Sequence, residues 1–204
     1  MNKIDYLRSI ITPLHTAAAE VAGENLKRGD VQPAVEPEIG GFLSLLVRLT
    51  SSKRVLELGT SNGCSALYML PAISENGGRL ISIDSKERLH KEAQANISAA
   101  GFADIAELIF GDAEDAVSSL EPGFDMIFQD CGKYLYPKLH NSLVEILKPG
   151  GFIVADDTLF SFEPDVRVNL GRHTDRYNRM VFDDPRLDSS ILPIGHGLTI
   201  SVKK

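Results

Sequence analysis

Short apolar runs alternate along the chain with longer segments whose apolar residues recur at a helical spacing. The runs have the length of buried strands and lie at residues 55–58, 79–84, 105–110, 124–129 and 152–155. Two more strands, at 188–193 and 197–202, are expected to close the chain as a hairpin. The intervening helices are expected at 85–100, 137–147 and 166–182. This alternation predicts an α/β fold with a seven-stranded, mostly parallel sheet, one antiparallel strand and helices on both faces.

The N-terminal segment is expected to be helical. Apolar residues share one face of residues 2–29, and Pro13 should divide this segment into two helices because proline has no amide donor. The two helices have either a purely structural role as a packing pair or a functional role as a cap over the active site or a dimer contact. A further helix at 39–49 contains Gly40-Gly41, which either lets the backbone approach a ligand or is a local irregularity.

Composition narrows the class of protein. At 204 residues, 43% of them hydrophobic, the chain is expected to form one domain over 1–204, with an N-terminal extension at 1–34 and a core at 35–204. No apolar run approaches the roughly 18 residues of a membrane span, and no leader pattern is visible. The net charge of −7 argues mildly against a nucleic-acid partner. Two cysteines, Cys64 and Cys131, make no disulfide framework and indicate a reducing, cytoplasmic location.

The stretch R-V-L-E-L-G-T-S-N-G-C-S-A, residues 54–66, is a strand, a glycine turn and the start of a helix near Ser65. Gly59 permits a tight turn, and the helix N-terminus offers free N–H groups to an anion. The G-x-G-x-x-G fingerprint of dinucleotide sites is absent, which disfavours a nicotinamide-dependent dehydrogenase. The pattern E-x-G-x-x-x-G, with Glu57 in the strand, instead resembles motif I of the class I S-adenosylmethionine (SAM) methyltransferases. A purely structural turn is the alternative.

Acids follow the next two strands. Asp84 lies 25 positions after Gly59, one strand-helix-strand step, where an acid accepts hydrogen bonds from ribose hydroxyls. Its alternative role is an N-cap for the helix at 85–100. Asp112, followed by Ala113, either accepts from the adenine amine of SAM or caps a helix at 114–120.

Asp130, Asp156 and Asp157 follow strands that are expected to be neighbours. Three converging carboxylates repel each other unless a cation neutralises them, and oxygen ligands suit Mg²⁺ or Ca²⁺, with Mn²⁺ as a further candidate. Alternatively, Asp156-Asp157 only caps the next helix. Lys133, near such a cation and a sulfonium, would have a lowered pKa and could act as a general base, whereas most loop lysines are simply solvated.

Three segments make a resemblance specific: D-C-G-K at 130–133, K-P-G-G-F-I-V-A-D-D-T-L-F at 148–160 and L-P-I-G-H-G-L-T-I at 192–200. They resemble the cation-dependent O-methyltransferases, the family of catechol and caffeoyl-CoA O-methyltransferases. The resemblance implies the class I SAM-methyltransferase fold, Rossmann-like, and a homodimer. It implies that Lys133 and Asp130 are catalytic and that Asp130, Asp156 and Asp157 bind the metal. The SAM-binding residues that it implies are Glu57, Gly59, Thr60, Ser61, Gly63, Ser65, Asp84, Asp112, Ala113 and Asp130.

The chain departs from the family pattern at three positions. The residue after Asp156 is usually Asn and is here Asp157, a loop aromatic is replaced by Cys64, and an acid of the last hairpin is replaced by His196. The expected activity is SAM-dependent, cation-dependent methylation of a hydroxyl on a small catechol-like or vicinal-oxygen acceptor. The aromatic residues expected near the acceptor, unless they belong to the core, are Tyr134, Tyr136, Phe160 and Phe162.

Two alternatives stay open. A tRNA wobble 5-hydroxyuridine O-methyltransferase could use the arginines that one helical face would present, which are Arg167, Arg172, Arg176 and Arg179. A non-catalytic SAM-binding protein would have no use for the three aspartates and Lys133. We therefore expect a small-molecule acceptor, with nucleic acid unlikely and no membrane partner.

Overall fold

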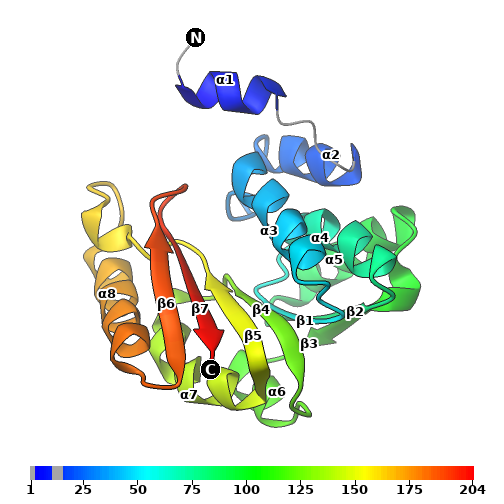
Figure 1. Cartoon of the computed structure of the whole chain (residues 1–204). Helices are drawn as coiled ribbons and strands as arrows, with labels where there is room; N and C mark the ends of the chain where they lie inside the picture. Colours follow the sequence, from blue (N-terminus) through cyan, green and yellow to red (C-terminus); the bar gives the residue numbers. More distant parts are fainter. Residues whose placement is uncertain (1–2, 11–15) are drawn as a thin grey trace. The chain divides into compact units, whose positions relative to one another are not determined.

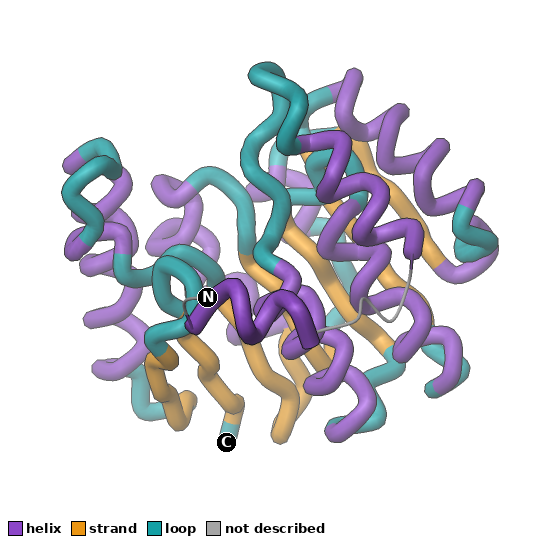
Figure 2. The backbone as a smooth tube through the Cα atoms, turned by 90° about the horizontal axis from the view of Figure 1, so that it is seen from above, coloured by secondary structure: helices purple, strands orange, loops and turns teal. Residues whose placement is uncertain are grey.

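The computed structural model describes residues 3–10 and 16–204, and the chain forms two compact units. The first unit is built from residues 1–53 and 60–110, and the second from residues 54–59 and 111–204. Each unit combines strands with helices, which are orange and purple in Figure 2. The prediction of a single domain divided at residue 34 stays a prediction.

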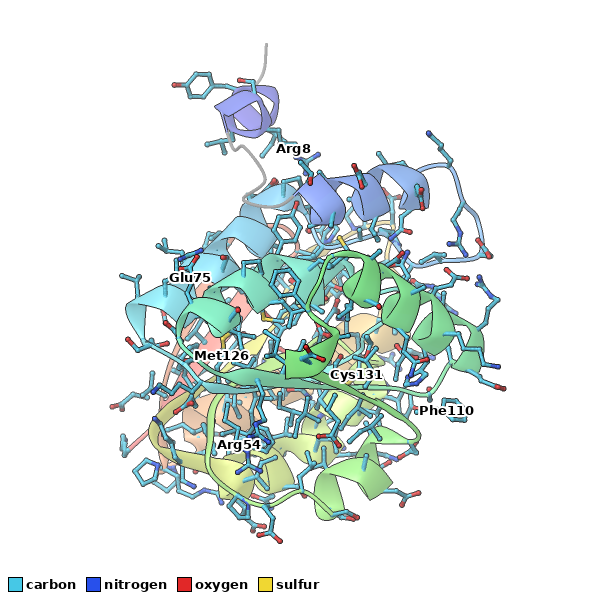
Figure 3. The ribbon with its side chains drawn as sticks, turned by 90° about the vertical axis from the view of Figure 1, so that its right-hand side faces the viewer. Arg8, Arg54, Glu75, Phe110, Met126 and Cys131 are labelled. Carbon is cyan, nitrogen blue, oxygen red and sulfur yellow. The ribbon has the colours of Figure 1, made fainter. Side chains whose placement is uncertain are left out.

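The first unit contains five helices and two strands among its described residues. These are α1 (Lys3–Ile10), α2 (Thr16–Asn25), α3 (Pro37–Leu49), α4 (Cys64–Glu75), β2 (Arg79–Asp84), α5 (Glu87–Ala99) and β3 (Ala106–Phe110), with a 3₁₀ turn at Ala103–Ile105. Strands β2 and β3 pair in parallel. Helices α2 and α3 both pack on α4 (Figure 1). The side chain of Arg8 on α1, labelled in Figure 3, lies 3.0 Å from Glu38 of α3.

The second unit carries the remaining strands. It contains β1 (Arg54–Leu58), α6 (Ala113–Ser118), β4 (Phe124–Gln129), α7 (Tyr136–Ile146), β5 (Leu147–Ala155), α8 (Val168–Asp183), β6 (Leu187–Leu192) and β7 (Leu198–Lys203), with 3₁₀ turns at Lys133–Leu135 and Phe160–Phe162. Strands β1, β4 and β5 are parallel, and β7 runs antiparallel to both β5 and β6. Helix α8 packs on α7 and lies beside β6 (Figure 1).

The strand order is β3-β2-β1-β4-β5-β7-β6, which confirms the expected seven-stranded α/β sheet with one antiparallel strand. The apolar runs locate the strands well because parallel strands are buried on both faces. No helix within residues 3–10 and 16–204 is long and apolar enough to cross a membrane.

The structure moves one strand boundary and gives Gly40 a packing role. The strand expected at 152–155 begins earlier, because the K-P-G-G segment at 148–151 belongs to β5, where Gly150 has a φ of +74° and the pairing with β4 shifts register. Gly40 makes room for the ring of Tyr68, since a Cβ there would collide with it. Pro13 lies outside the described residues.

Candidate active site

The turn after β1 is built on a glycine for a steric reason. Gly59 has a φ of +103°, and a Cβ at this position would collide with the backbone carbonyl of Asp130. The backbones meet here because the amide of Asp130 donates to the carbonyl of Leu58 at 2.8 Å. Glu57, one residue earlier on β1, is fully buried. The contact of Glu57 with SAM stays a prediction.

In the first unit, neutral hydrogen bonds fix most of the loop of residues 60–63. Thr60 shares a hydrogen bond of 2.5 Å with Ser82, and its carbonyl accepts from the amide of Gly63 at 2.8 Å. Ser61 has a φ of +48° and Gly63 a φ of +91°. No side chain caps α4 at Gly63. The first-turn N–H groups of α4, which include that of Ser65, therefore suit an anionic group such as a carboxylate.

Asp84 braces this loop. Its Oδ2 accepts from the amide of Ser61 at 2.8 Å, and its Oδ1 accepts from the amide of Lys86 at 2.7 Å. The N-cap of α5 is Lys86, so the alternative role of Asp84 as the N-cap is wrong. A carboxylate has about four acceptor sites, so two remain for ribose hydroxyls. That contact stays a prediction.

Asp112 does cap a helix. It is the N-cap of α6, and its Oδ1 accepts from the amide of Glu114 at 2.8 Å. Its neighbour Ala113 is buried. The capping role is confirmed, and the contact with adenine stays a prediction.

The second unit brings a lysine and its partners together in what we call the Lys133 cluster: Asp130, Lys133, Tyr136, Asp156 and Asp157. The side chain of Lys133 is only 8% exposed. Its Nζ lies 2.9 Å from Asp130 Oδ1, 2.9 Å from Asp157 Oδ2 and 2.9 Å from the hydroxyl of Tyr136. That hydroxyl is also 2.7 Å from the carbonyl of Gln129, to which it donates. One ammonium thus holds two carboxylates and a tyrosine.

Neighbouring parallel strands explain why these residues meet. Gln129 pairs with Ala155 at the carboxyl ends of β4 and β5, and the amide of Asp156 donates to the carbonyl of Gln129 at 3.1 Å. Asp130 and Asp156 are therefore the first residues beyond adjacent strand ends. Lys133 begins the 3₁₀ turn that follows β4. The tyrosine hydroxyl was missed as a polar partner, although its i+3 spacing from Lys133 is compatible with one helical turn.

Asp157 occupies an unusual backbone conformation. Its φ is +59°, and its amide donates to the Oδ1 of Asp156 at 2.8 Å. Asp and Asn tolerate the left-handed region better than most residues with a side chain. The conformation accounts for a short polar residue here, and the choice of Asp adds a charge.

Charge and burial determine the protonation of the cluster. Burial alone would lower the pKa of Lys133, but Asp130, Tyr136 and Asp157 outweigh it and raise that pKa well above its usual range. Burial raises the pKa of Asp156 well above its usual range, and the charges of Asp130 and Asp157 raise it further. The lowered pKa expected for Lys133 assumed a cation and a sulfonium nearby. In the protein alone the shift has the opposite sign, and Lys133 is the counter-ion of the aspartates.

The three aspartates of the Lys133 cluster are the expected metal ligands. Within the described part of the chain, no three or more His, Cys, Asp or Glu side chains are arranged to hold a metal ion. The ammonium of Lys133 lies between Asp130 and Asp157, while Asp156 bonds to the amide of Asp157. The chemistry of the donors nevertheless fits a hard cation, because three carboxylates follow two neighbouring strand ends and hard cations prefer oxygen ligands.

His196 and Phe160 border the cluster. His196 Nδ1 lies 3.4 Å from Asp157 Oδ1, and its imidazole ring centroid lies 5.5 Å from that of Phe160. Lys133 Nζ lies 5.5 Å from the centroid of the same phenyl ring. Of the other expected aromatics, Tyr136 is buried in the cluster, whereas Tyr134 and Phe162 are exposed.

Three kinds of similarity identify the family. A model of a family described as O-methyltransferase matches residues 10–204. The chain is 34% identical over 171 residues to a catechol O-methyltransferase of Niastella koreensis, covering 78% of this chain and 75% of that protein. It is 30% identical over 175 residues to a caffeoyl-CoA O-methyltransferase of Eucalyptus globulus, covering 79% and 71%.

Solved structures agree with the sequence relatives. The O-methyltransferase of Bacillus cereus in complex with S-adenosylhomocysteine (SAH) superposes with a TM-score of 0.86 at 25% identity, covering 98% of this chain and 96% of that one. An O-methyltransferase of tomaymycin synthesis from Streptomyces achromogenes, in complex with SAM, gives a TM-score of 0.85 at 25% identity, covering 100% and 96%. The chain therefore belongs to the O-methyltransferase family, and it is a SAM-dependent enzyme.

Proposed function

We propose that this enzyme is cation-dependent and methylates a hydroxyl group of a small catechol-like or vicinal-oxygen acceptor. The observation that carries the proposal is the Lys133 cluster, in which a buried lysine and three aspartates follow two neighbouring strand ends. The relatives named for catechol and caffeoyl-CoA support the acceptor class. A protein that only bound SAM would not need this costly set of partly buried charged side chains.

The proposed SAM-binding residues are those expected from the sequence. Ser65 and the first turn of α4 would take the carboxylate of SAM at the backbone N–H groups of the helix N-terminus. Asp84 would accept from the ribose, with the two acceptor sites that its backbone partners leave. Asp112 would accept from the adenine amine while it caps α6. SAM supplies an electrophilic methyl group on its sulfonium when bound.

Asp130, Asp156 and Asp157 would hold Mg²⁺, with Ca²⁺ and Mn²⁺ as alternatives. Such a cation is a Lewis acid that stabilises an acceptor oxyanion and orients two vicinal oxygens. Asp130 and Asp157 would then share their negative charge between the cation and Lys133. This weaker stabilisation of the ammonium favours the neutral form of Lys133. Neutral Lys133 would accept the acceptor's hydroxyl proton at Nζ, and Tyr136 would keep the amine oriented through its hydroxyl. Phe160 and His196 would flank the acceptor ring.

The acceptor class is tested with a panel. Purified enzyme, SAM and Mg²⁺ are mixed with a catechol, a monophenol of matched size and a tRNA that contains 5-hydroxyuridine. We expect turnover of the catechol and little turnover of the monophenol, which lacks the second oxygen. Equal turnover of catechol and monophenol would contradict the vicinal-oxygen proposal. The same preparation, measured by light scattering, tests the proposed homodimer.

The tRNA in the panel tests the second candidate. Arg172, Arg176 and Arg179 are all exposed on α8, and Arg167 just before it is exposed too. Arg179 is paired with Asp175 at 3.0 Å, and the chain carries a net charge of −7. These charges oppose the attraction of a phosphate backbone. Turnover on tRNA alone would make the arginines of α8 the acceptor site.

A further inference from the structure

A buried pair of amide side chains connects the N-terminal helix α2 to the glycine loop in the first unit. Asn25 Nδ2 donates to Asn62 Oδ1 at 3.2 Å, and Asn62 Nδ2 donates to Asn25 Oδ1 at 2.6 Å. Asn25 is 7% exposed and Asn62 is 2% exposed. Each amide is the partner of the other, so the loss of one leaves a buried polar group without its hydrogen bonds.

Asn62 lies in the most constrained part of the loop. Its neighbours Ser61 and Gly63 both have a positive φ. Its carbonyl accepts from the Nδ2 of Asn96 on α5 at 2.9 Å. Helix α5 therefore fixes the backbone of Asn62, while α2 fixes its side chain. A strained residue such as Ser61 keeps its conformation only when its surroundings hold it.

Helix α2 depends on this contact in return. It has ten residues, of which Ala18, Val21 and Asn25 are buried, and it packs on α4 (Figure 1). A helix of this length is marginal in isolation, so its order comes from docking. A further polar link to the loop region is the Cys64 thiol, which donates to the carbonyl of Ala18 at 3.7 Å.

We propose that Asn25 is a positioning residue for the cofactor: through Asn62 it holds the loop in the conformation that binds SAM. The inference rests on the proposed role of residues 59–65 in SAM binding. Asn25 itself does not touch the cofactor. Because coupling is reciprocal, a bound cofactor stabilises the docking of α2 by the same factor by which docking favours the cofactor.

The test measures SAH binding to the full chain by calorimetry, which needs neither acceptor nor cation. We expect Asn25→Ala to weaken SAH binding about tenfold, because one buried amide loses its partner. The Asn62→Ala variant and the double variant should lose about the same factor, since the two residues act as one pair. Steady-state kinetics should show a raised KM for SAM and a kcat within about twofold of wild type.

Asn76→Ala is the matched control. Asn76 ends α4 at its other terminus, and its Nδ2 donates to the carbonyls of Val47 and Ser52, both at 3.0 Å. This variant should lower the melting temperature about as much as Asn25→Ala, with SAH affinity unchanged. Hydrogen exchange adds a readout that general destabilisation would not produce. SAH should slow exchange in residues 17–25 of wild type, and much less so in Asn62→Ala.

Three results would overturn the proposal. The first is wild-type affinity for SAH in Asn25→Ala despite a lowered melting temperature. The second is an equal loss of affinity in Asn76→Ala, which would make the effect one of general stability. The third is a wild-type chain that does not bind SAH. This result would also remove the proposed cofactor role of the loop, and it is seen in the wild type alone, without any variant.

Discussion

The loop of residues 60–63 and the Lys133 cluster are organised by opposite physical means. Apart from the Asp84 carboxylate, which accepts from the amide of Ser61, the loop is held by neutral hydrogen bonds, among them Thr60 with Ser82 and Asn25 with Asn62. The cluster is held by charge, with one ammonium between two carboxylates. Neutral bonds give one fixed geometry, whereas ionic partners can be exchanged. The loop therefore suits a constant ligand, and the cluster suits a cation and a moving proton.

The largest effect should come from Lys133→Met, which removes the charge and keeps most of the side-chain volume. We expect kcat to fall about 10²–10⁴-fold, the range for loss of a general base, with SAH affinity within about twofold of wild type. Lys138→Ala is the control, since Lys138 is an exposed lysine that pairs with Glu114 at 3.0 Å. If Lys133→Met kept a tenth or more of the wild-type kcat, a group other than Lys133 would accept the hydroxyl proton.

Gly59→Ala should have the next largest effect. The change combines a positive φ with a collision against the carbonyl of Asp130, so we expect a loss of roughly 3 kcal/mol in the free energy of unfolding. Gly101→Ala separates the two causes, because Gly101 has a φ of +83° and nothing within 4 Å of a Cβ. It should lose only about 1 kcal/mol. Equal losses in urea unfolding would show that the collision does not matter.

The charged side chains around Asp184 have no proposed catalytic role and can be compared with the Lys133 cluster. Asp184 is 7% exposed, with hydrogen bonds from Arg186 and His140. The hydrogen bonds from Arg186 hold the pKa of Asp184 well below its ordinary 3.8. Because the folded pKa is the lower one, this stabilisation is complete above the ordinary value and is lost as the pH falls below it. Asp184→Asn should cost roughly 2 kcal/mol at pH 7 and less at pH 3. A cost independent of pH would show that the charge does not contribute.

Asp157→Asn should have the smallest effect. Asn tolerates the φ of +59° and keeps an oxygen that can bind a cation, so only the charge is lost. We expect the Mg²⁺ concentration for half-maximal activity to rise by less than about tenfold, because one of three carboxylates is removed. Asp157→Ala, which also loses the oxygen, should raise it further. The reverse order would argue that backbone strain, not ligation, controls this position.

Much of this arrangement is predictable from local pattern. The run F-D-M-I-F-Q forms β4 over Phe124–Gln129, and the acids after β4 and β5 converge because parallel strands end at the same edge. The pattern could not decide between open alternatives: Asp112 is an N-cap and Asp84 is not. Those outcomes depend on where each helix begins, which shifts by one or two residues at no cost visible in the sequence.

Long-range partners were beyond local reasoning. The Asn25–Asn62 pair joins residues 37 positions apart, and neither asparagine has a periodic or motif signal. The raised pKa of Lys133 likewise follows from how Asp130 and Asp157 face it, not from their spacing. The direction of a pKa shift needs the three-dimensional balance of burial and charge.

The most direct test of the central claim is the dependence of catechol methylation on a divalent cation. Enzyme is treated with excess EDTA, assayed with SAM and a catechol, and assayed again after Mg²⁺ exceeds the chelator. We expect EDTA to abolish turnover and Mg²⁺ to restore it, while SAH binding stays unchanged throughout. Turnover that continues undiminished in EDTA would show that the aspartates serve only as counter-ions of Lys133.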